Sequence, residues 1–153
     1  MKLFALSTFA LLSALPAFAG GSSTVGPGNP AAYFCLNAGG ALESVNYRAG
    51  QDALCRFGDR AAIPQWTFFR AKDEPGELAV RTFFNPKPAK VNAMGNPASL
   101  YCRAQGGKTE IARLEDGSEI GICKFSDNSG IEEWTLFRGV NDASNAELVK
   151  ALR

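Results

Sequence analysis

The chain of 153 residues contains no histidine. Imidazole is the side chain that most often acts as a general base near neutral pH and as a neutral metal ligand. Its absence excludes a Ser-His-Asp triad, a Cys-His nucleophile pair and any His-ligated metal. The four cysteines show no C-x-x-C spacing, which argues against a redox-active pair and against a four-thiolate metal site. We therefore expect no catalytic residue, no metal site and no cofactor.

The chain also lacks a second long hydrophobic run after its N-terminal segment. There, Lys2 is followed by the apolar run Leu3–Leu15, and Ala17-Phe18-Ala19 forms an A-x-A cleavage site. This order of regions is typical of a secretory signal peptide. We expect cleavage after residue 19, a periplasmic or secreted location, and no stable membrane insertion.

A net charge of one sign is missing as well. The sequence has 16 basic and 15 acidic residues, and removal of residues 1–19 takes away Lys2 and no acid. The mature chain is then neutral, which favours neither a nucleic-acid partner nor an anionic lipid surface. Export instead places the four cysteines in an oxidising compartment, where two disulfides are the simplest outcome.

The rest of the chain contains one unit twice. Matching residues recur at an offset of 67 and, after one inserted residue, of 68. The matched pairs are Asn29-Pro30-Ala31 with Asn96-Pro97-Ala98, Cys35 with Cys102, Gly39-Gly40 with Gly106-Gly107, Cys55 with Cys123, Phe57 with Phe125, Asp59 with Asp127, Ile63 with Ile131, Trp66-Thr67 with Trp134-Thr135, and Phe69-Arg70 with Phe137-Arg138. We infer an internal duplication, with a first unit at residues 28–71, a linker at 72–94, a second unit at 95–139 and a C-terminal tail at 140–153.

Each unit is too short to bury a sufficient core alone. Four cysteines allow three pairings, and the spacing does not choose among them. The duplication favours Cys35–Cys55 and Cys102–Cys123, because each ancestral unit would carry its own pair. Closing such a loop of about 20 residues stabilises the fold by roughly 3 kcal/mol. Packing of the two units on each other is a second source of stability.

Local signals predict an α+β fold of two tandem helix–hairpin–helix units. Asn29 as N-cap, Pro30 at the first helical position and Gly39-Gly40 as a stop predict a helix, and the second unit repeats these signals. Residues 108–125 predict a β-hairpin with its turn at 115–118, and the corresponding turn of the first unit falls near 49–51. Residues 131–138 are ambiguous, and we favour a helix because residues 129–132 match a capping box.

Three further segments carry weaker signals. Glu77–Phe84, inside the linker, predicts an extra strand, and Ser144–Arg153 predicts a terminal helix. On the second strand of the second hairpin, Ile120 and Ile122 face away from Cys123. This apolar back face either packs on the partner unit or forms a binding surface.

The order N-P-A-x-x-x-C, G-G, G-x-C-x-F and E-E-W-x-x-F-R resembles a family of small exported bacterial domains of unknown function, whose members often carry the label haemolysin. The second unit matches closely, whereas the first has Ala53 in place of Gly121 and Pro64-Gln65 in place of Glu132-Glu133. The resemblance implies a small bacterial periplasmic or secreted domain and no established reaction. No amphipathic hairpin or membrane-length segment supports a pore-forming role.

Trp66 and Trp134 each precede an arginine by four residues, Arg70 and Arg138. On a helix each pair would be adjacent, which predicts a cation–π contact within the core. The alternative is an aromatic-plus-arginine anchor for a partner, since such residues dominate binding hot spots. Together with Ile122, these four are the candidate binding residues.

We expect an exported, non-enzymatic binding protein whose partner is another envelope or secreted protein. A peptidase inhibitor is an alternative, which would present Ser126–Gly130 as an exposed, rigid loop. A small hydrolase that uses Glu132 or Asp127 as general acid/base is another. Glu132 and Glu133 would point about 100° apart on a helix and cannot flank one bond. Their simpler role is a favourable charge at a helix N-terminus.

Overall fold

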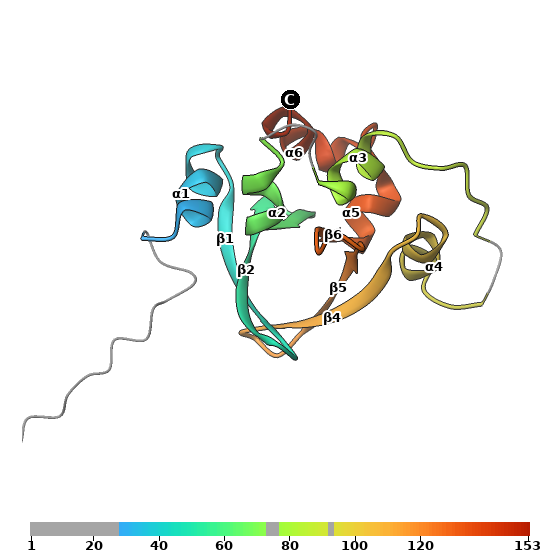
Figure 1. Cartoon of the computed structure of the whole chain (residues 1–153), viewed down its shortest axis with the longest axis horizontal. Coiled ribbons are helices and arrows are strands. Elements are labelled where there is room, and N and C mark those ends of the chain that lie inside the picture. The colour runs from blue at the N-terminus through green and yellow to red at the C-terminus, as the bar shows by residue number, and fades with distance from the viewer. Residues whose placement is uncertain (1–27, 73–76, 92–93) are drawn as a thin grey trace, which may run out of the picture.

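The computed structural model describes residues 28–72, 77–91 and 94–153. The predicted signal peptide, residues 1–19, lies outside the described residues. The described chain has a mixed α+β architecture in which helices cover one face of a strongly curved antiparallel sheet (Figure 1). Within these three ranges, no helix has the length and apolar character needed to cross a membrane.

The sheet contains three strands from each unit. They are β1 (Ala41–Tyr47), β2 (Gly50–Phe57), β3 (Ala61–Pro64), β4 (Lys108–Leu114), β5 (Glu119–Lys124) and β6 (Gly130–Glu132), in the spatial order β3-β2-β1-β4-β5-β6. The two units join where β1 pairs with β4, with Asn46 opposite Arg113. These two residues occupy equivalent positions in the repeat, so an approximate twofold axis passes between them.

The helices repeat in the same way. They are α1 (Pro30–Asn37), α2 (Gln65–Arg70), α3 (Leu78–Phe84), α4 (Pro97–Ala104), α5 (Glu133–Arg138) and α6 (Ala146–Ala151), with a short 3-10 helix at Ala143–Asn145 before α6. The predicted caps are confirmed, because the side chains of Asn29 and Asn96 accept hydrogen bonds from the N–H groups of Ala31 and Ala98. The predicted hairpins and the C-terminal helix are also present.

Two predicted segments differ in the structure. Residues 131–138 are divided between a strand and a helix, and the N-cap of α5 is Glu132 rather than Ser129. Each unit is therefore helix, strand, strand, strand, helix. The predicted strand at Glu77–Phe84 is wrong, since this segment is α3. The second unit supplies its cap: the N–H of Leu78 donates to Asp127 Oδ2 at 2.7 Å, and the N–H of Ala79 donates to Ser129 Oγ at 2.9 Å.

The curved sheet closes where β3 approaches β6, through a reciprocal pair of hydrogen bonds that each edge strand donates to a threonine on a helix of the other unit, α5 or α2. The N–H of Ala62 in β3 donates to Thr135 Oγ1, and the N–H of Gly130 in β6 donates to Thr67 Oγ1, both at 3.0 Å. The two threonines are equivalent in the repeat, and both are buried. Each unit thus satisfies an edge-strand N–H of the other unit, which turns the open sheet into a near-barrel.

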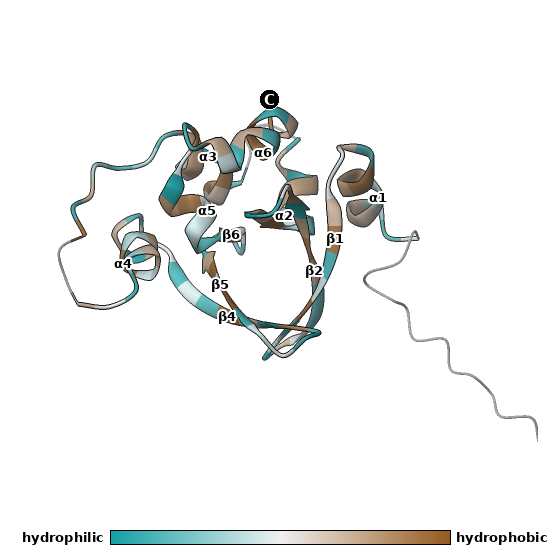
Figure 2. Ribbon diagram, turned by 180° about the vertical axis from the view of Figure 1, so that it is seen from behind, coloured by the Kyte–Doolittle hydropathy of each residue, from teal (hydrophilic) through white to brown (hydrophobic). Residues whose placement is uncertain are grey.

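The inner face of the curve buries a small apolar cluster shared by the units. It contains Val45, Leu54, Ala62, Ala112 and Ile122. Ile122 is fully buried there. The predicted back face therefore packs on the partner unit and is not a free binding surface. In Figure 2, β2 and β5 carry much of the apolar colour, whereas β4 is mainly hydrophilic.

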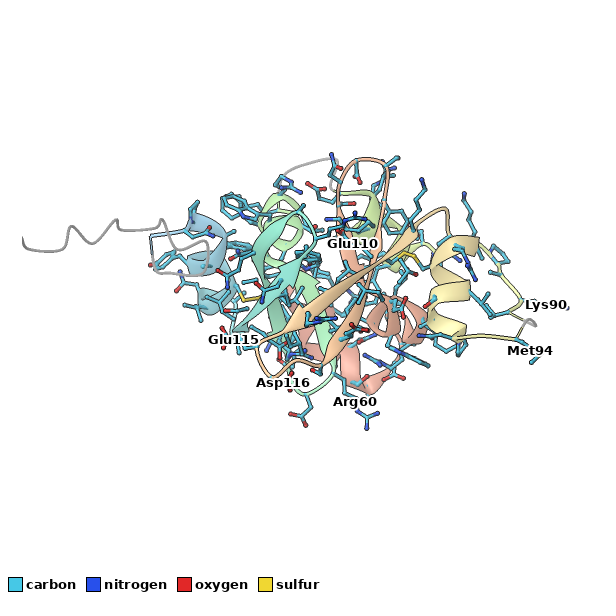
Figure 3. The ribbon with its side chains drawn as sticks, turned by 90° about the horizontal axis from the view of Figure 1, so that it is seen from below. Arg60, Lys90, Met94, Glu110, Glu115 and Asp116 are labelled. Atoms are coloured by element: carbon cyan, nitrogen blue, oxygen red, sulfur yellow. A yellow bond between two sulfur atoms is a disulfide. The ribbon has the colours of Figure 1, made fainter. Side chains whose placement is uncertain are left out.

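The outer face of the sheet packs on the helices and holds one disulfide per unit, Cys35–Cys55 and Cys102–Cys123, as predicted. All four sulfur atoms belong to the same buried core (the yellow bonds in Figure 3). The second glycine of each Gly-Gly pair makes room for the bridge. A Cβ on Gly40 would lie 2.5 Å from Cys55 Sγ, and a Cβ on Gly107 would lie 2.4 Å from Cys123 Sγ.

The helix that follows each unit contacts the other unit. α3 follows the first unit and packs on β6 of the second. Ala151 and Leu152, at the end of α6, line a small pocket with Phe34 and Phe68 of the first unit. The helices α3 of the predicted linker and α6 of the predicted tail therefore belong to a shared core, and the two units form one folded body.

Candidate functional site

Each unit carries a triad of aromatic rings on its helices. In the second unit the rings of Tyr101, Phe137 and Trp134 are in sequence, with Phe137 at 5.5 Å from Tyr101 and 5.6 Å from Trp134, centroid to centroid. Both contacts are edge-to-face, which is a favourable geometry for aromatic pairs. We call these three residues the second triad.

The first unit has the equivalent arrangement. Phe69 lies 5.7 Å from Phe34 and 5.9 Å from Trp66, again in edge-to-face contacts. We call Phe34, Trp66 and Phe69 the first triad. Lys72 covers it, with its ammonium nitrogen 4.3 Å from the centroid of the Phe69 ring. Val140 occupies the equivalent position in the second unit, so the second triad has no corresponding cation.

The two triads consequently differ in exposure. Trp134 is 39% exposed and Phe137 is 38% exposed, whereas Trp66 and Phe69 of the first triad are both less exposed. The expectation that both tryptophans belong to the core is therefore wrong for Trp134. Trp134 and Phe137 of α5 are the solvent-facing part of the second triad, and Tyr101 of α4 is half-buried beside Phe137.

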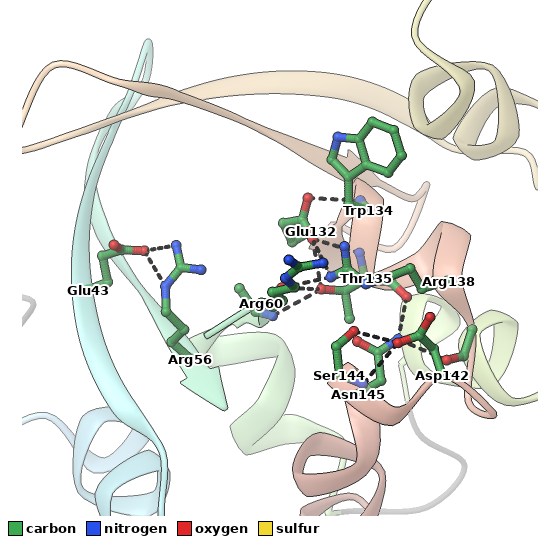
Figure 4. Close-up of polar contacts among 12 residues, drawn as sticks. Glu43, Arg56, Arg60, Glu132, Trp134, Thr135, Arg138, Asp142, Ser144 and Asn145 are labelled. Carbon is green, nitrogen blue, oxygen red and sulfur yellow. Dashed lines mark hydrogen bonds and ion pairs between the residues drawn. The ribbon is translucent and has the colours of Figure 1, made fainter. Parts of the chain in front are cut away.

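Neither predicted tryptophan–arginine contact forms. The cation–π contacts of the described residues involve Lys72 and Lys124. Arg70 instead forms an ion pair with Glu77, and Arg138 donates from Nη2 to the carbonyl oxygen of Arg60 at 2.8 Å (Figure 4). The side chain of Arg138 is 18% exposed and lies 3.8 Å from Glu132. This arginine joins the two units and is not available as an exposed anchor.

Glu132 caps α5 with both carboxylate oxygens. Oε1 accepts from the N–H of Trp134 at 2.8 Å, and Oε2 accepts from the N–H and the hydroxyl of Thr135 at 2.6 and 2.7 Å. Burial raises the pKa of this carboxyl, and the hydrogen bonds from Trp134 and Thr135 oppose that shift. A raised pKa is a property of general acids. Here, however, the oxygens are engaged by the protein's own backbone, which supports the simpler role of a helix cap.

Glu133, the first residue of α5, is buried among neutral donors. Its carboxylate accepts hydrogen bonds from Asn96 Nδ2 at 2.8 Å, Ser99 Oγ at 2.8 and 2.9 Å, and Thr109 Oγ1 at 3.1 Å. Gly121 makes room for it, since a Cβ there would lie 2.4 Å from Glu133 Cδ. This network fixes the start of α5, and hence the neighbouring Trp134, against α4 and β4.

The first unit has different residues at the positions of this hydrogen-bond network. Gln65 stands where Glu133 does, and Ala32, Leu42 and Ala53 stand at the positions of Ser99, Thr109 and Gly121. Gln65 turns to Asp52, with 2.6 Å between Nε2 and Oδ1. The two units therefore share the same arrangement of helices and strands. Only the second unit combines a hydrogen-bonded buried glutamate, Glu133, with an aromatic triad over whose rings no lysine of the described chain lies.

The loop predicted as an inhibitory element is a tight turn. Asp127 accepts from the N–H and hydroxyl of Ser129 through Oδ1, and Asn128 has a positive φ of 64°. Ser129 and Gly130 are buried, so only Ser126, Asp127 and Asn128 are exposed. Hydrogen bonding to Ser129 and Leu78 keeps the pKa of Asp127 below its usual range, although burial opposes the shift. This carboxylate holds the loop and α3 in place.

Comparison with known proteins gives the relationship that the repeated pattern predicts. The sequence profile of a domain of unknown function, DUF333, matches residues 26–72 and again residues 93–140. The chain belongs to the DUF333 family. It contains two tandem copies of the DUF333 domain, and this confirms the resemblance inferred from the motifs.

Curated relatives add no function. The chain is 38% identical over 53 residues to the uncharacterized protein YoaF of Escherichia coli K12, and equally to YoaF of Shigella flexneri. The match covers 35% of this chain and 61% of the relative's length. No solved structure matches the chain. Two disulfides, one per DUF333 copy, indicate an oxidising compartment outside the cytoplasm.

Sequence reasoning missed two members of the second triad. The sequence predicts Trp134 as a binding residue, but it gives no comparable signal for Tyr101 or Phe137. Phe137 lies three residues after Trp134 on α5, and Tyr101 lies on α4. The repeat register carries only a weaker signal, since Phe34 and Phe69 of the first copy occupy the same places. Lys72 lies over Phe34 and Phe69 of the first triad, whereas the aligned residue of the second DUF333 copy is Val140.

Proposed function

We propose that this protein is an exported, non-enzymatic binding protein whose second triad is the contact surface for another envelope or secreted protein. The observation that carries the proposal is the exposure of Trp134 and Phe137 on a rigid support. Exposed aromatic residues with fixed geometry are the side chains that most often dominate protein–protein hot spots. They bury a large area and lose little conformational entropy on binding.

The surroundings of the patch suit a protein partner. Trp134 follows Glu133, whose carboxylate accepts hydrogen bonds from three side chains: the N-cap residue of α4, a residue of α4 and a residue of β4. The rings are therefore held in place before binding, which lowers the entropic cost of association. Ile111 of β4 is a further exposed apolar side chain of the same unit, at 53% exposure. Haemolytic or hydrolytic activity has no comparable support in the geometry.

The test begins in the native host. A photo-reactive phenylalanine analogue is placed at Phe137, and the matched control carries it at Leu36, which is also exposed but lies on α1 of the first unit. The proposal predicts one dominant cross-linked protein from position 137 that is absent from position 36. That protein is then purified and titrated with the mature chain.

In this titration Trp134→Ala should weaken binding by about 30-fold, which corresponds to a hot-spot loss of about 2 kcal/mol. Leu36→Ala should leave the affinity unchanged, and circular dichroism should show that both variants are folded. Equal cross-linking from both positions would refute the proposal. So would wild-type affinity of Trp134→Ala for the purified partner.

A further inference from the structure

A second surface feature is independent of the aromatic patch. A groove of about 610 Å³ lies between α3, the segment that follows it, and the second unit. Leu78 and Phe125 form its apolar part, and Arg81 and Lys87 provide positive charge. We call this feature the α3 groove. Its volume falls within the range of small-molecule sites in proteins.

The position of Lys87 in the α3 groove is fixed by the second unit. The N–H of Lys87 donates to Gln105 Oε1 at 2.8 Å, and Gln105 Nε2 donates to the carbonyl oxygen of Lys87 at 2.9 Å. Gln105 is 4% exposed. The backbone that follows α3 is therefore clamped beside α4, and Lys87 is held in the lining of the groove together with Gln105.

The charge in the groove is not compensated. Within the described ranges neither Arg81 nor Lys87 forms an ion pair. The lining adds the neutral donors Thr82, Asn85 and Ser126 and includes no carboxylate. Asp127, next to Ser126, directs its carboxylate to Ser129 and to the N–H of Leu78 instead. An anion in the groove would meet two cations and several donors.

We propose that the α3 groove binds a small organic anion, whose carboxylate or phosphate contacts Arg81 and Lys87 and whose short apolar part packs on Leu78 and Phe125. Guanidinium and ammonium groups form their strongest hydrogen bonds with such oxyanions. Phe125 is 8% exposed and belongs to the core, so the apolar part rests on a fixed wall. The proposal does not depend on the function proposed for the second triad.

The experiment titrates the mature chain, residues 20 onward, with four probes followed by ¹⁵N NMR. Hexanoate and hexyl phosphate carry both features, hexanol lacks the charge, and inorganic phosphate lacks the apolar chain. We expect saturable binding of at least one of the first two, with a Kd on the order of 1 mM. Tighter binding of hexanoate assigns a carboxylate ligand, and tighter binding of hexyl phosphate assigns a phosphate monoester. Shifts should centre on Arg81, Lys87 and Phe125.

Variants make the assignment specific. Arg81→Glu and the milder Arg81→Gln should each weaken the better probe by at least about fivefold, as expected for loss of a charge-assisted contact. The matched control is Lys90→Glu, because Lys90 is an exposed cation of the same segment that does not line the groove and lies out along the linker (Figure 3). Trp134→Ala should bind the probe normally, which separates this proposal from the previous one.

Three results would overturn the proposal. The first is absence of saturable binding by both hexanoate and hexyl phosphate. The second is equal affinity for hexanol or for inorganic phosphate, which would remove the need for an organic anion. The third is an equal loss in Lys90→Glu and Arg81→Glu, which would reflect net charge alone.

Discussion

At the scale of single residues, the two glycines that follow α1 and α4 have different physical roles. Gly106 adopts a φ of 92°, in the left-handed region that glycine adopts most easily. Gly107 instead lies against the disulfide, because a Cβ there would be 2.4 Å from Cys123 Sγ and 2.9 Å from Cys102 Sγ. The Gly-Gly pair thus ends the helix with its first residue and admits the bridge with its second.

Gly107→Ala tests the second role. The new methyl group would force the sulfur atoms or the strand to move, and we expect the free energy of unfolding to fall by about 1–3 kcal/mol. Urea denaturation monitored by circular dichroism measures the change. The control is Gly28→Ala, where no heavy atom lies within 4 Å of the added Cβ. If both variants unfold at the wild-type midpoint, the steric role of Gly107 is wrong.

Glu132 gives a residue-level prediction about pH. Burial raises the pKa of its carboxyl above the ordinary value of 4.5 in the folded state. Between that value and the raised one, the folded state holds more protons than the unfolded state, so stability falls as pH rises through this window. Glu132→Gln cannot titrate, and its free energy of unfolding should lack this decline.

The measurement is a series of urea denaturation curves for wild type and Glu132→Gln, from below pH 4.5 to neutral pH. The difference between the two proteins isolates Glu132 from the other acids, several of which have lowered pKa values and titrate at lower pH. Parallel pH profiles of the two proteins would contradict the raised pKa.

At the scale of the elements, the exchange between Thr67 and Thr135 fixes the closure of the sheet. Thr135→Val preserves the shape of the side chain but leaves the N–H of Ala62 without its acceptor, and it also removes the hydroxyl donor to Glu132. Because both groups are buried, we expect a loss of about 1–3 kcal/mol. Thermal unfolding provides the readout, and Thr135→Ser, which retains the hydroxyl, should lose less. Equal losses would assign the effect to the methyl group instead.

The elements that sequence predicts well are those whose signals are local. The N-caps Asn29 and Asn96 lie directly before their helices, and the second hairpin has its Asp-Gly turn in place. The sequence does not predict α3, because its capping acceptors, Asp127 and Ser129, lie 49 and 50 residues away in the other unit. β6 has only three residues, too few to show a period of two.

The candidate site follows the same rule. Trp134 can be identified because the duplication repeats it, but its exposure depends on tertiary packing. Lys72 lies over Phe34 and Phe69 of the first triad, and the second unit has Val140 at the equivalent position. The contact of Arg138 cannot be predicted from sequence because its acceptor, the carbonyl oxygen of Arg60, is 78 residues distant. The sequence allows two roles for Ile122, and the packing of the units shows that it is a core residue.

At the scale of the whole molecule, each half is incomplete without the other. The first half provides α3 to the second, the second provides the cap of α3, and each threonine satisfies the other half's edge strand. Across the twofold axis Asn46 faces Arg113. A homodimer of the second half would place Arg113 opposite its own copy, and like charges directly opposite each other destabilise a strand pair. The tandem arrangement is therefore favoured over self-association of the second half.

We accordingly predict that fragments 28–91 and 94–153, each produced with its disulfide formed, do not fold independently and associate when mixed. Each fragment alone would expose the strand edge and the inner cluster that the other half covers. A fragment of this size buries a smaller fraction of its surface than a larger domain does, so its free energy of unfolding would be small. Native mass spectrometry should find a 1:1 complex, and ¹⁵N NMR of either labelled fragment should change from poor to native-like dispersion on addition of its partner.

The matched control mixes the first fragment with a second fragment carrying Thr135→Val, which should associate more weakly because one of the reciprocal bonds is lost. A second fragment that is monomeric, well dispersed and cooperatively unfolding on its own would show that the halves are separate domains, and the shared closure of the sheet would then contribute little to folding.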